Sequence, residues 1–237
     1  MPELLLGLLA VAVAVAVTGV GVADAVRDVK RARDTIDVTG SARQPITADV
    51  VHWSLSVSAD ATRTEDAVRL LRRRAAAVRT FLRDAGLPSS AVTEPPVITE
   101  EILLRAGARR RVPGFRLVQR FRINSTEIDK VEEIAGRATD LLAEGIPVST
   151  GDLSYISANL ARARIQALKK AIRDARRRAE TIVTGIGGTL GSVKSASLGV
   201  YQVVPRNSTE VSDYGINDTT SREKDVYAVV SVTFRVR

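Results

Sequence analysis

Val51-His-Trp-Ser-Leu-Ser-Val-Ser58 is the segment that decides the fold class of this chain. In it, apolar residues at positions 51, 53, 55 and 57 alternate with polar residues at positions 52, 54, 56 and 58. Successive side chains of a β-strand point to opposite faces of the sheet, so this alternation predicts a strand with one buried and one polar face. Such half-buried strands are typical of antiparallel sheets, because parallel sheets are usually covered on both faces.

The segments on either side predict more strands and three helices. Two strands are expected within residues 35–57, and further strands within 92–104, 115–124, 148–157, 192–204 and 226–236. Apolar residues that recur every three or four positions predict helices at 64–85, 127–144 and 159–184. Helices and strands do not alternate regularly in this order. It therefore predicts an α+β fold, in which helices pack on one face of an antiparallel or mixed sheet.

The strand expected at 115–124 has two chemically different faces. Its apolar face should carry Phe115, Leu117, Phe121 and Ile123. Its other face should carry Arg116, Arg120 and Arg122. The first face is expected in the core, and the arginines are expected to be solvated.

Two of the expected helices allow finer predictions. Ser125 or Thr126 is expected to cap the helix at 127–144, since hydroxyl side chains satisfy the free N–H groups of a first turn. The helix at 159–184 is expected to bury a stripe formed by Leu168, Ile172, Ala175, Ala179 and Ile182. The small alanines of this stripe would let the helix lie close against a sheet.

The N-terminus carries a long apolar run that begins at Leu4 and ends at Ala23 and contains no charged residue. At about 1.5 Å per residue, a helix of this length would cross the hydrocarbon layer of a bilayer. We therefore expect residues 1–33 to form a single transmembrane anchor with a basic flank, and residues 34–237 to form one soluble domain. Ala23-Asp-Ala25 has the small-x-small form that signal peptidases accept, so cleavage of the segment is the alternative.

The charges beside this run bear on its orientation in the membrane. No Lys or Arg precedes it, whereas Arg27, Lys30, Arg31 and Arg33 follow it closely. Because positive charges are retained on the cytoplasmic side, this flank alone would place the domain in the cytoplasm.

The composition argues against several classes of activity. The chain has no Cys and a single His, His52, within an expected strand. Disulfides, thiolate nucleophiles and Cys-based metal sites are excluded, and the sequence has no G-x-S-x-G motif of a serine hydrolase. The net charge of +8 would suit nucleic acid or anionic lipid. Its basic residues are scattered, however, and only nine aromatic residues are present, so nucleic acid is not favoured.

Three other groups of residues are candidate sites. Asp213, Asn217 and Asp218 could form part of an oxygen-ligand metal site, but a turn-forming role is favoured. The glycines of residues 185–191 follow a helix and lead into a strand, the reverse of a phosphate-binding loop. Asp49 would matter only if a second carboxylate lay beside it. We therefore assign no catalytic, cofactor-binding or metal-ligating residue, and no cofactor.

Several short motifs, in their order and spacing, resemble the membrane-anchored branch of the SIMPL-domain family over almost all of residues 34–237. They are Val38-Thr-Gly40, Ala48-Asp49, Trp53, Phe81-Leu82, Gly86, Gly145-Ile146, Leu190-Gly191, Gly199-Val-Tyr-Gln202, Asp213-Tyr-Gly-Ile-Asn-Asp-Thr219 and Lys224-Asp-Val226. The resemblance implies an α+β domain, usually exported or tethered to a membrane, which in some relatives assembles into multi-subunit rings. It implies no catalytic residue and only a loose link to envelope or stress functions.

Taken together, the sequence leads us to expect a non-enzymatic, membrane-anchored SIMPL-type domain that acts by binding or self-assembly. We expect it to be a homo-oligomer outside the cytoplasm at the cell envelope. One alternative is a domain facing the cytoplasm that binds anionic lipid or nucleic acid through its basic residues. Another is an enzyme that uses carboxylates such as Asp49. The sequence does not identify a small-molecule ligand.

Overall fold

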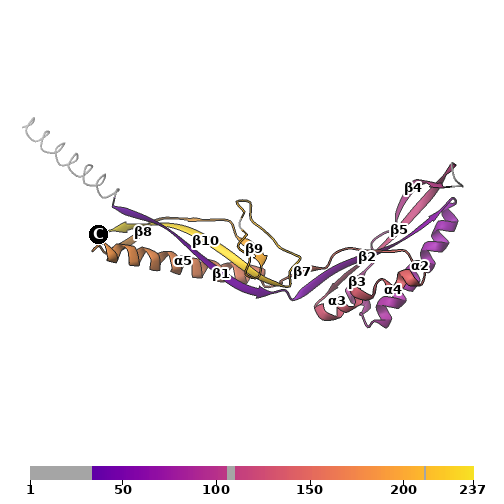
Figure 1. The fold of residues 1–237 in the computed structure, drawn as a ribbon, viewed down its shortest axis with the longest axis horizontal. Helices are drawn as coiled ribbons and strands as arrows, with labels where there is room; N and C mark the ends of the chain where they lie inside the picture. The colour runs from indigo at the N-terminus through magenta and orange to yellow at the C-terminus, as the bar shows by residue number, and fades with distance from the viewer. Residues whose placement is uncertain (1–33, 106–109, 211) are drawn as a thin grey trace, which may run out of the picture. The chain divides into compact units, whose positions relative to one another are not determined.

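The computed structural model describes residues 34–105, 110–210 and 212–237 (Figure 1). The expected N-terminal anchor therefore lies outside the described residues. Residues 34–237, expected as one domain, divide into two compact units. Unit 1 contains the described residues up to Arg43 together with 164–201 and 227–237. Unit 2 contains residues 44–163 and 202–226.

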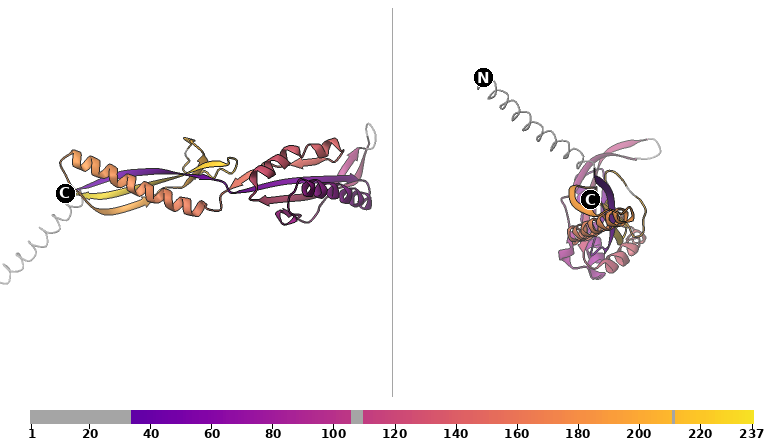
Figure 2. Two further views of the ribbon diagram at one scale, coloured as in Figure 1. Left: turned by 90° about the horizontal axis from the view of Figure 1, so that it is seen from below. Right: turned by 90° about the vertical axis from the view of Figure 1, so that its left-hand side faces the viewer.

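Unit 1 is built from three strands and one long helix. The strands are β1 (Thr35–Thr47), β10 (Glu223–Val236) and β8 (Leu190–Leu198), and they lie in the order β1-β10-β8. Helix α5 (Leu160–Gly185) runs along this sheet (Figures 1 and 2). Residues Val38, Ala228, Val230, Val232 and Phe234 form the buried face of the sheet.

The buried stripe of α5 differs from the prediction. Ala175 and Ala179 are buried as expected, but Ile172 and Ile182 are 47% and 48% exposed, and Leu168 is only half-buried. The stripe consists instead of residues spaced four apart: Ala163, Ala167, Ala171, Ala175, Ala179 and Val183. The reason is the short distance between α5 and β1. A Cβ atom added at Gly40 would lie 2.3 Å from the carbonyl oxygen of Ala171, which leaves no room for isoleucine between them.

Unit 2 contains a six-stranded antiparallel sheet with β2 (Val50–Ala61) and β5 (Arg111–Ser125) at its centre. Strands β3 (Val92–Thr93) and β4 (Ile98–Arg105) pair with β5. Strands β6 (Val148–Thr150) and β7 (Ser154–Ile156) pair with β2, and β9 (Gln202–Pro205) pairs with β10. The segments expected as single strands at 92–104 and 148–157 are therefore each divided into two.

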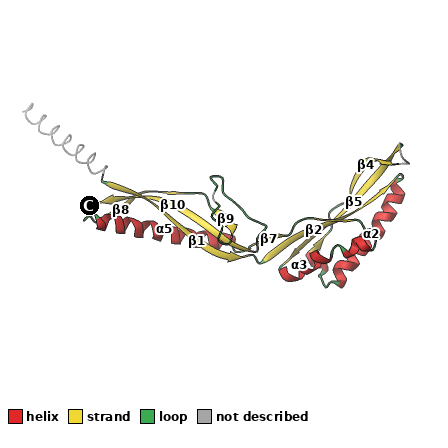
Figure 3. Cartoon of the chain, viewed as in Figure 1, coloured by secondary structure: helices red, strands yellow, loops and turns green. Residues whose placement is uncertain are grey.

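The helices of unit 2 lie on one face of this sheet (Figure 3). They are α2 (Thr64–Asp84), α3 (Ile128–Arg137) and α4 (Asp140–Ala143). A short 3-10 turn, η1 (Ser89–Ala91), lies between α2 and β3. Leu117, Phe121 and Ile123 of β5 are buried beneath the helices, and Phe115 packs against them, as the alternation predicts. The helix expected at 127–144 is interrupted between Arg137 and Asp140.

The predicted cap of this helix was wrong. The N-cap residue of α3 is Glu127, and its side chain makes no capping hydrogen bond. The Ser125 hydroxyl instead accepts a hydrogen bond of 3.0 Å from the backbone N–H of Glu127, one step before the helix. Serine therefore shapes the turn into α3 without capping its first turn.

The structure confirms the α+β class with antiparallel sheets, but it has two sheets where the sequence suggested one. The core residues of β2 and β5 lie on the helix side of the sheet. The alternate residues on the other side, which include His52, Ser54, Arg120, Arg122 and Asn124, are exposed, and we call that side the open face. Within the described ranges, no helix has both the length and the apolar character needed to cross a bilayer.

Candidate functional site

The residues weighed as catalytic candidates lie apart in the fold. His52 is exposed on the open face of β2, opposite Asn124 of β5. Asp49 accepts hydrogen bonds from the backbone N–H of Ala158 at 2.7 Å and from the Asn159 side chain at 3.3 Å. The carboxylate of Asp49 thus holds the segment that precedes α5. Among the described residues, no three His, Asp or Glu side chains are grouped closely enough to hold a metal ion.

Asp218 lies in a turn and pairs with a buried lysine. Its Oδ1 atom accepts hydrogen bonds from Thr220 and Ser221, and its Oδ2 atom is 3.7 Å from Nζ of Lys224. Burial alone would raise the pKa of Asp218, but these hydrogen bonds and the charge of Lys224 outweigh it and lower the pKa. Burial lowers the pKa of Lys224. Asp213 is not part of this pair.

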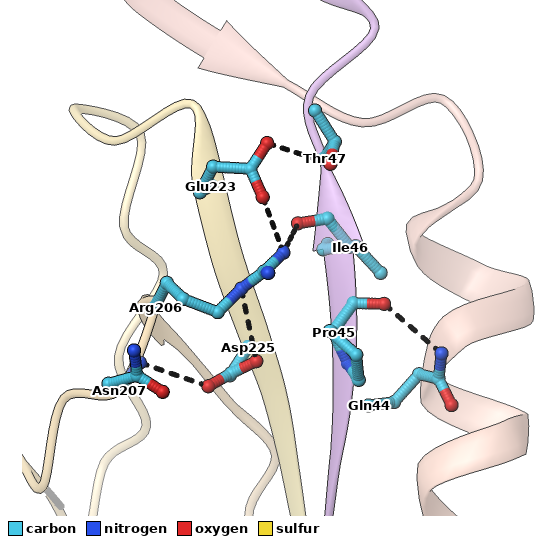
Figure 4. A network of polar contacts seen from close by, with 8 residues as sticks. All are labelled: Gln44, Pro45, Ile46, Thr47, Arg206, Asn207, Glu223 and Asp225. Carbon is cyan, nitrogen blue, oxygen red and sulfur yellow. Dashed lines mark hydrogen bonds and ion pairs between the residues drawn. The ribbon is translucent and has the colours of Figure 1, made fainter.

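A second polar network fixes the start of the loop that follows β9 (Figure 4). The Arg206 guanidinium forms ion pairs with Glu223 at 2.6 Å and with Asp225 at 3.6 Å, and it donates a hydrogen bond to the carbonyl oxygen of Ile46. Asp225 also accepts from the backbone N–H of Asn207, which has a positive φ of 63°. Each of these groups is satisfied by its neighbours, so we interpret this network as structural.

The glycine-rich segment after α5 forms a helix end and a turn. Gly187 has a φ of +80°, and the N–H of Gly188 donates to the carbonyl oxygen of Val183. The chain then enters β8 at Leu190. Since no helix begins at these glycines, their N–H groups do not form the helix N-terminus that a phosphate-binding loop requires.

The β8 edge of unit 1 is the candidate functional site. In the described part of the chain, β8 pairs with β10 on one side and has no strand on its other side. All residues from Ser192 to Leu198 are exposed. An unpaired strand edge offers a row of N–H and C=O groups to another strand.

Apolar side chains surround this edge. Val193 and Leu198 lie opposite Phe234 and Val230, so they are on the α5 side of the sheet, yet they are 55% and 49% exposed. Helix α5 lies close against β1 at Gly40, and the exposure of Val193 and Leu198 indicates that it leaves them uncovered. Ile172, which is also exposed, lies on the flank of α5 opposite Asp174. We call Ile172, Val193 and Leu198, with the free side of β8, the β8 surface.

The opposite edge of the same sheet is protected. The backbone N–H of Ser41 in β1 donates a hydrogen bond of 3.1 Å to Oδ2 of Asp174 on α5. Asp174 also forms an ion pair with Arg178 at 2.8 Å. A carboxylate that occupies an edge N–H hinders the pairing of another strand there. Unit 1 therefore has one hindered edge and one open edge.

The sequence indicated the strand and missed its exposure. Alternation of residues can predict a strand but does not say whether that strand is central or at an edge. From the sequence, Val193 and Leu198 are expected within a strand, with no prediction of their burial. The one signal available was the composition of residues 192–197, in which serine and lysine outnumber apolar residues.

A comparison with known families gives one match. The SIMPL family model, described as a protein of unknown function (DUF541), matches residues 36–234. This range includes every helix and almost every strand residue that the structure describes. No curated protein matches the chain.

Proposed function

The chain belongs to the SIMPL family, and from this premise we propose that it acts by self-association at the cell envelope and catalyses no reaction. In this proposal the apolar run from Leu4 to Ala23 tethers the chain to the membrane. The domain lies outside the cytoplasm, and copies of it associate through the β8 surface. A link to stress responses is implied only by the family resemblance and stays a prediction.

The observation that carries the proposal is the open β8 edge with its uncovered apolar side chains. A strand edge is satisfied by a second strand, and every copy of this chain presents the same edge. Two copies related by a two-fold axis could pair β8 with β8 in antiparallel fashion, which gives a closed, self-complementary contact. The same pairing would bring Val193 and Leu198 under cover. Burial of such side chains stabilises a contact by about 25 cal/mol per Å² of apolar area.

We propose no reaction because the two candidate carboxylates, those of Asp49 and Asp218, already make structural contacts. Asp49 is engaged with the backbone before α5, and Asp218 is engaged with Lys224. Both carboxylates thus make structural contacts in unit 2. The family resemblance brings no catalytic residue with it.

We predict that Leu198→Glu prevents self-association. A carboxylate at this half-exposed position costs the single copy little but would be buried without a partner in the assembly. The measurement is light scattering of the full chain in non-ionic detergent at micromolar concentrations. Wild type should give the mass of two copies, and Leu198→Glu the mass of one.

Ser197→Glu is the matched control, because Ser197 lies opposite Ser231 on the other face of the same strand. It should keep the mass of the wild-type assembly. A wild type that is a single copy throughout, or a Leu198→Glu variant that associates like wild type, would contradict the proposed role of the β8 surface.

The proposed topology can be tested separately, since the chain has no native cysteine. Thr209 is exposed in the loop after β9, so Thr209→Cys should accept a maleimide. We expect a membrane-impermeant maleimide to label this variant in intact cells, because the domain is proposed to lie outside the cytoplasm. The unsubstituted chain gives the background. Labelling only after lysis would place the domain in the cytoplasm, where Arg27 and the basic residues after it could bind anionic lipid.

A further inference from the structure

The open face of the unit 2 sheet carries a polar groove that the proposed self-association does not use. The groove has a volume of about 410 Å³. Its lining includes His52, Ser54, Thr93, Arg122, Asn124 and Asp152. A volume of this size falls within the range of small-molecule sites, roughly 300–1,000 Å³.

The register of the strands explains how these residues meet. Thr93 of β3 pairs with Arg122 of β5, and Arg122 pairs with Ser54 of β2, so the three side chains form one row across the sheet. Asn124, His52 and Ser154 form the next row in the same way. Directly paired side chains lie about 4.5–5.5 Å apart at their Cβ atoms, close enough to contact one ligand.

Gly151 keeps one side of the groove open. Its N–H donates a hydrogen bond of 2.8 Å to the carbonyl oxygen of Ser54, which brings the 151 backbone against β2. A Cβ atom at position 151 would lie 2.8 Å from the Ser54 hydroxyl. Any side chain there would therefore crowd a hydroxyl that lines the groove. Asp152 follows directly and contributes the one carboxylate of the lining.

Arg122 differs from most other arginines of this unit. Arg116, on the same face of β5, is paired with Asp60 at 2.7 Å, and Arg79 is paired with Glu94 at 2.6 Å. Within the described residues, the guanidinium of Arg122 has neither an ion pair nor a hydrogen bond, and the same holds for Arg120. Of these two, only Arg122 lines the groove. A guanidinium without a partner, beside hydroxyl and amide groups, is suited to hold an oxyanion.

We propose that this groove binds a phosphorylated polyol, such as a sugar phosphate. Arg122, with Thr93 beside it, holds the phosphate, because a guanidinium can donate two parallel hydrogen bonds to it. The hydroxyl groups of the ligand are held by groups that both donate and accept, on Ser54, His52 and Asn124, and by the acceptor Asp152. The carboxylate of Asp152 would repel a bare anion and gains contacts only from hydroxyl donors. The lining therefore favours a ligand that carries both a phosphate and hydroxyl groups.

Single-stranded nucleic acid fits this face less well. Its bases require aromatic platforms for stacking. The indole of Trp53 is only 3% exposed and points into the core, so the one exposed aromatic ring of the lining is the imidazole of His52. A single ring provides no platform for successive bases. Of the three arginines that β5 places on this face, Arg116 is paired with Asp60, which leaves two, Arg120 and Arg122, for a phosphate backbone.

The test is isothermal titration calorimetry on the full chain in non-ionic detergent, with glucose 6-phosphate, inorganic phosphate and glucose as probes. We expect glucose 6-phosphate to bind at least fivefold more tightly than inorganic phosphate, and glucose not to bind. Arg122→Gln should weaken glucose 6-phosphate binding at least tenfold. Arg120→Gln is the matched control, two residues away on the same face, and should change it less than twofold.

Asp152→Asn separates the two halves of the site. This variant should weaken binding of glucose 6-phosphate while inorganic phosphate binds equally well or better, because a repelling charge has gone. Equal binding of phosphate and glucose 6-phosphate by wild type would overturn the proposal, as would equal losses in the Arg120 and Arg122 variants. Because Arg122 and Asp152 are exposed, circular dichroism should show an unchanged fold. The Leu198→Glu variant should bind the probes like wild type. The test of ligand binding in the groove is therefore independent of the test of self-association through the β8 surface.

Discussion

Gly40→Ala is expected to destabilise unit 1 by about 3 kcal/mol, at the upper end of what one extra methyl group costs in a packed core. The added Cβ atom would lie 2.3 Å from the oxygen of Ala171, 2.4 Å from the nitrogen of Ala175 and 2.6 Å from the Cβ atom of Ala175. Two of these three atoms belong to the helix backbone and cannot be relieved by a change of rotamer. Helix α5 would have to move away from β1.

Movement of α5 would weaken packing along the whole alanine stripe, because each buried alanine contacts the sheet only at this short distance. Chemical unfolding followed by circular dichroism gives the loss of stability. Hydrogen exchange with mass spectrometry shows its place, since peptides from α5 should exchange faster than in wild type. Unchanged exchange in α5 would mean that the contact at Gly40 does not position the helix.

Gly136→Ala is the control for this substitution. Gly136 lies within α3, and a Cβ atom added there meets no other atom within 4 Å. Alanine also favours helix over glycine by about 0.5–1 kcal/mol. The same chemical change should therefore stabilise the protein slightly at position 136 and destabilise it strongly at position 40. The contrast isolates the close approach of helix and strand from any general effect of losing a glycine.

The α5 stripe also marks the limit of what could be predicted from sequence. Hydropathy ranks Ile172 and Ile182 above alanine as core residues, so the sequence favoured them. The structure buries alanines because Gly40, 131 positions before Ala171, lets the backbones approach closely. Nothing near α5 in the sequence carries that information. In contrast, the faces of β2 and β5 were predicted correctly, since alternation within one strand defines them.

The polar groove was predictable only in part. The alternation of β5 places Arg120 and Arg122 on the open face, which the sequence indicated. The contribution of Thr93 depends on how β3 pairs with β5, and that of Asp152 depends on a turn between two short strands. Both were expected to lie within or between longer strands. Register between strands is set by packing, so the set of residues that line the groove required the structure.

Lys224→Met is expected to cost about 3–5 kcal/mol, because it removes one partner of a buried ion pair. The side chains of Lys224 and Asp218 are 3% and 6% exposed. The ammonium group of Lys224 also donates a hydrogen bond to the carbonyl oxygen of Asp218. Oδ2 of Asp218 has no hydrogen-bond partner, so the charge of Lys224 is what compensates its burial. Chemical unfolding at neutral pH measures the loss.

The double variant Lys224→Met, Asp218→Asn shows whether the cost comes from the orphaned carboxylate. Asparagine retains an oxygen that can accept from Thr220 and Ser221, and it carries no charge that burial penalises. The double variant should therefore recover most of the stability that Lys224→Met loses. A double variant as unstable as the single one would mean that Lys224 stabilises unit 2 through packing rather than through its charge.

The pKa shifts of this pair predict how stability depends on pH. Asp218 has a folded-state pKa below its usual 3.8, so it contributes stability above pH 3.8 that is lost as the pH falls through the lowered value. Lys224 has a folded-state pKa below its usual 10.5, so the unfolded chain holds more protons between the two values. Stability from this group therefore rises with pH across that window.

These two effects can be separated by the Lys224→Met variant. Without the ammonium charge, one of the causes that lower the pKa of Asp218 is gone, so less stability should be lost between pH 7 and pH 3 than in wild type. The alkaline rise that belongs to Lys224 should vanish entirely. The comparison between wild type and variant cancels the other carboxylates, such as Asp60, whose pKa is lowered by its hydrogen bond with Arg116. If both proteins lose the same stability in acid, the charge of Lys224 does not act on Asp218, and the pair is joined only by the bond to the backbone.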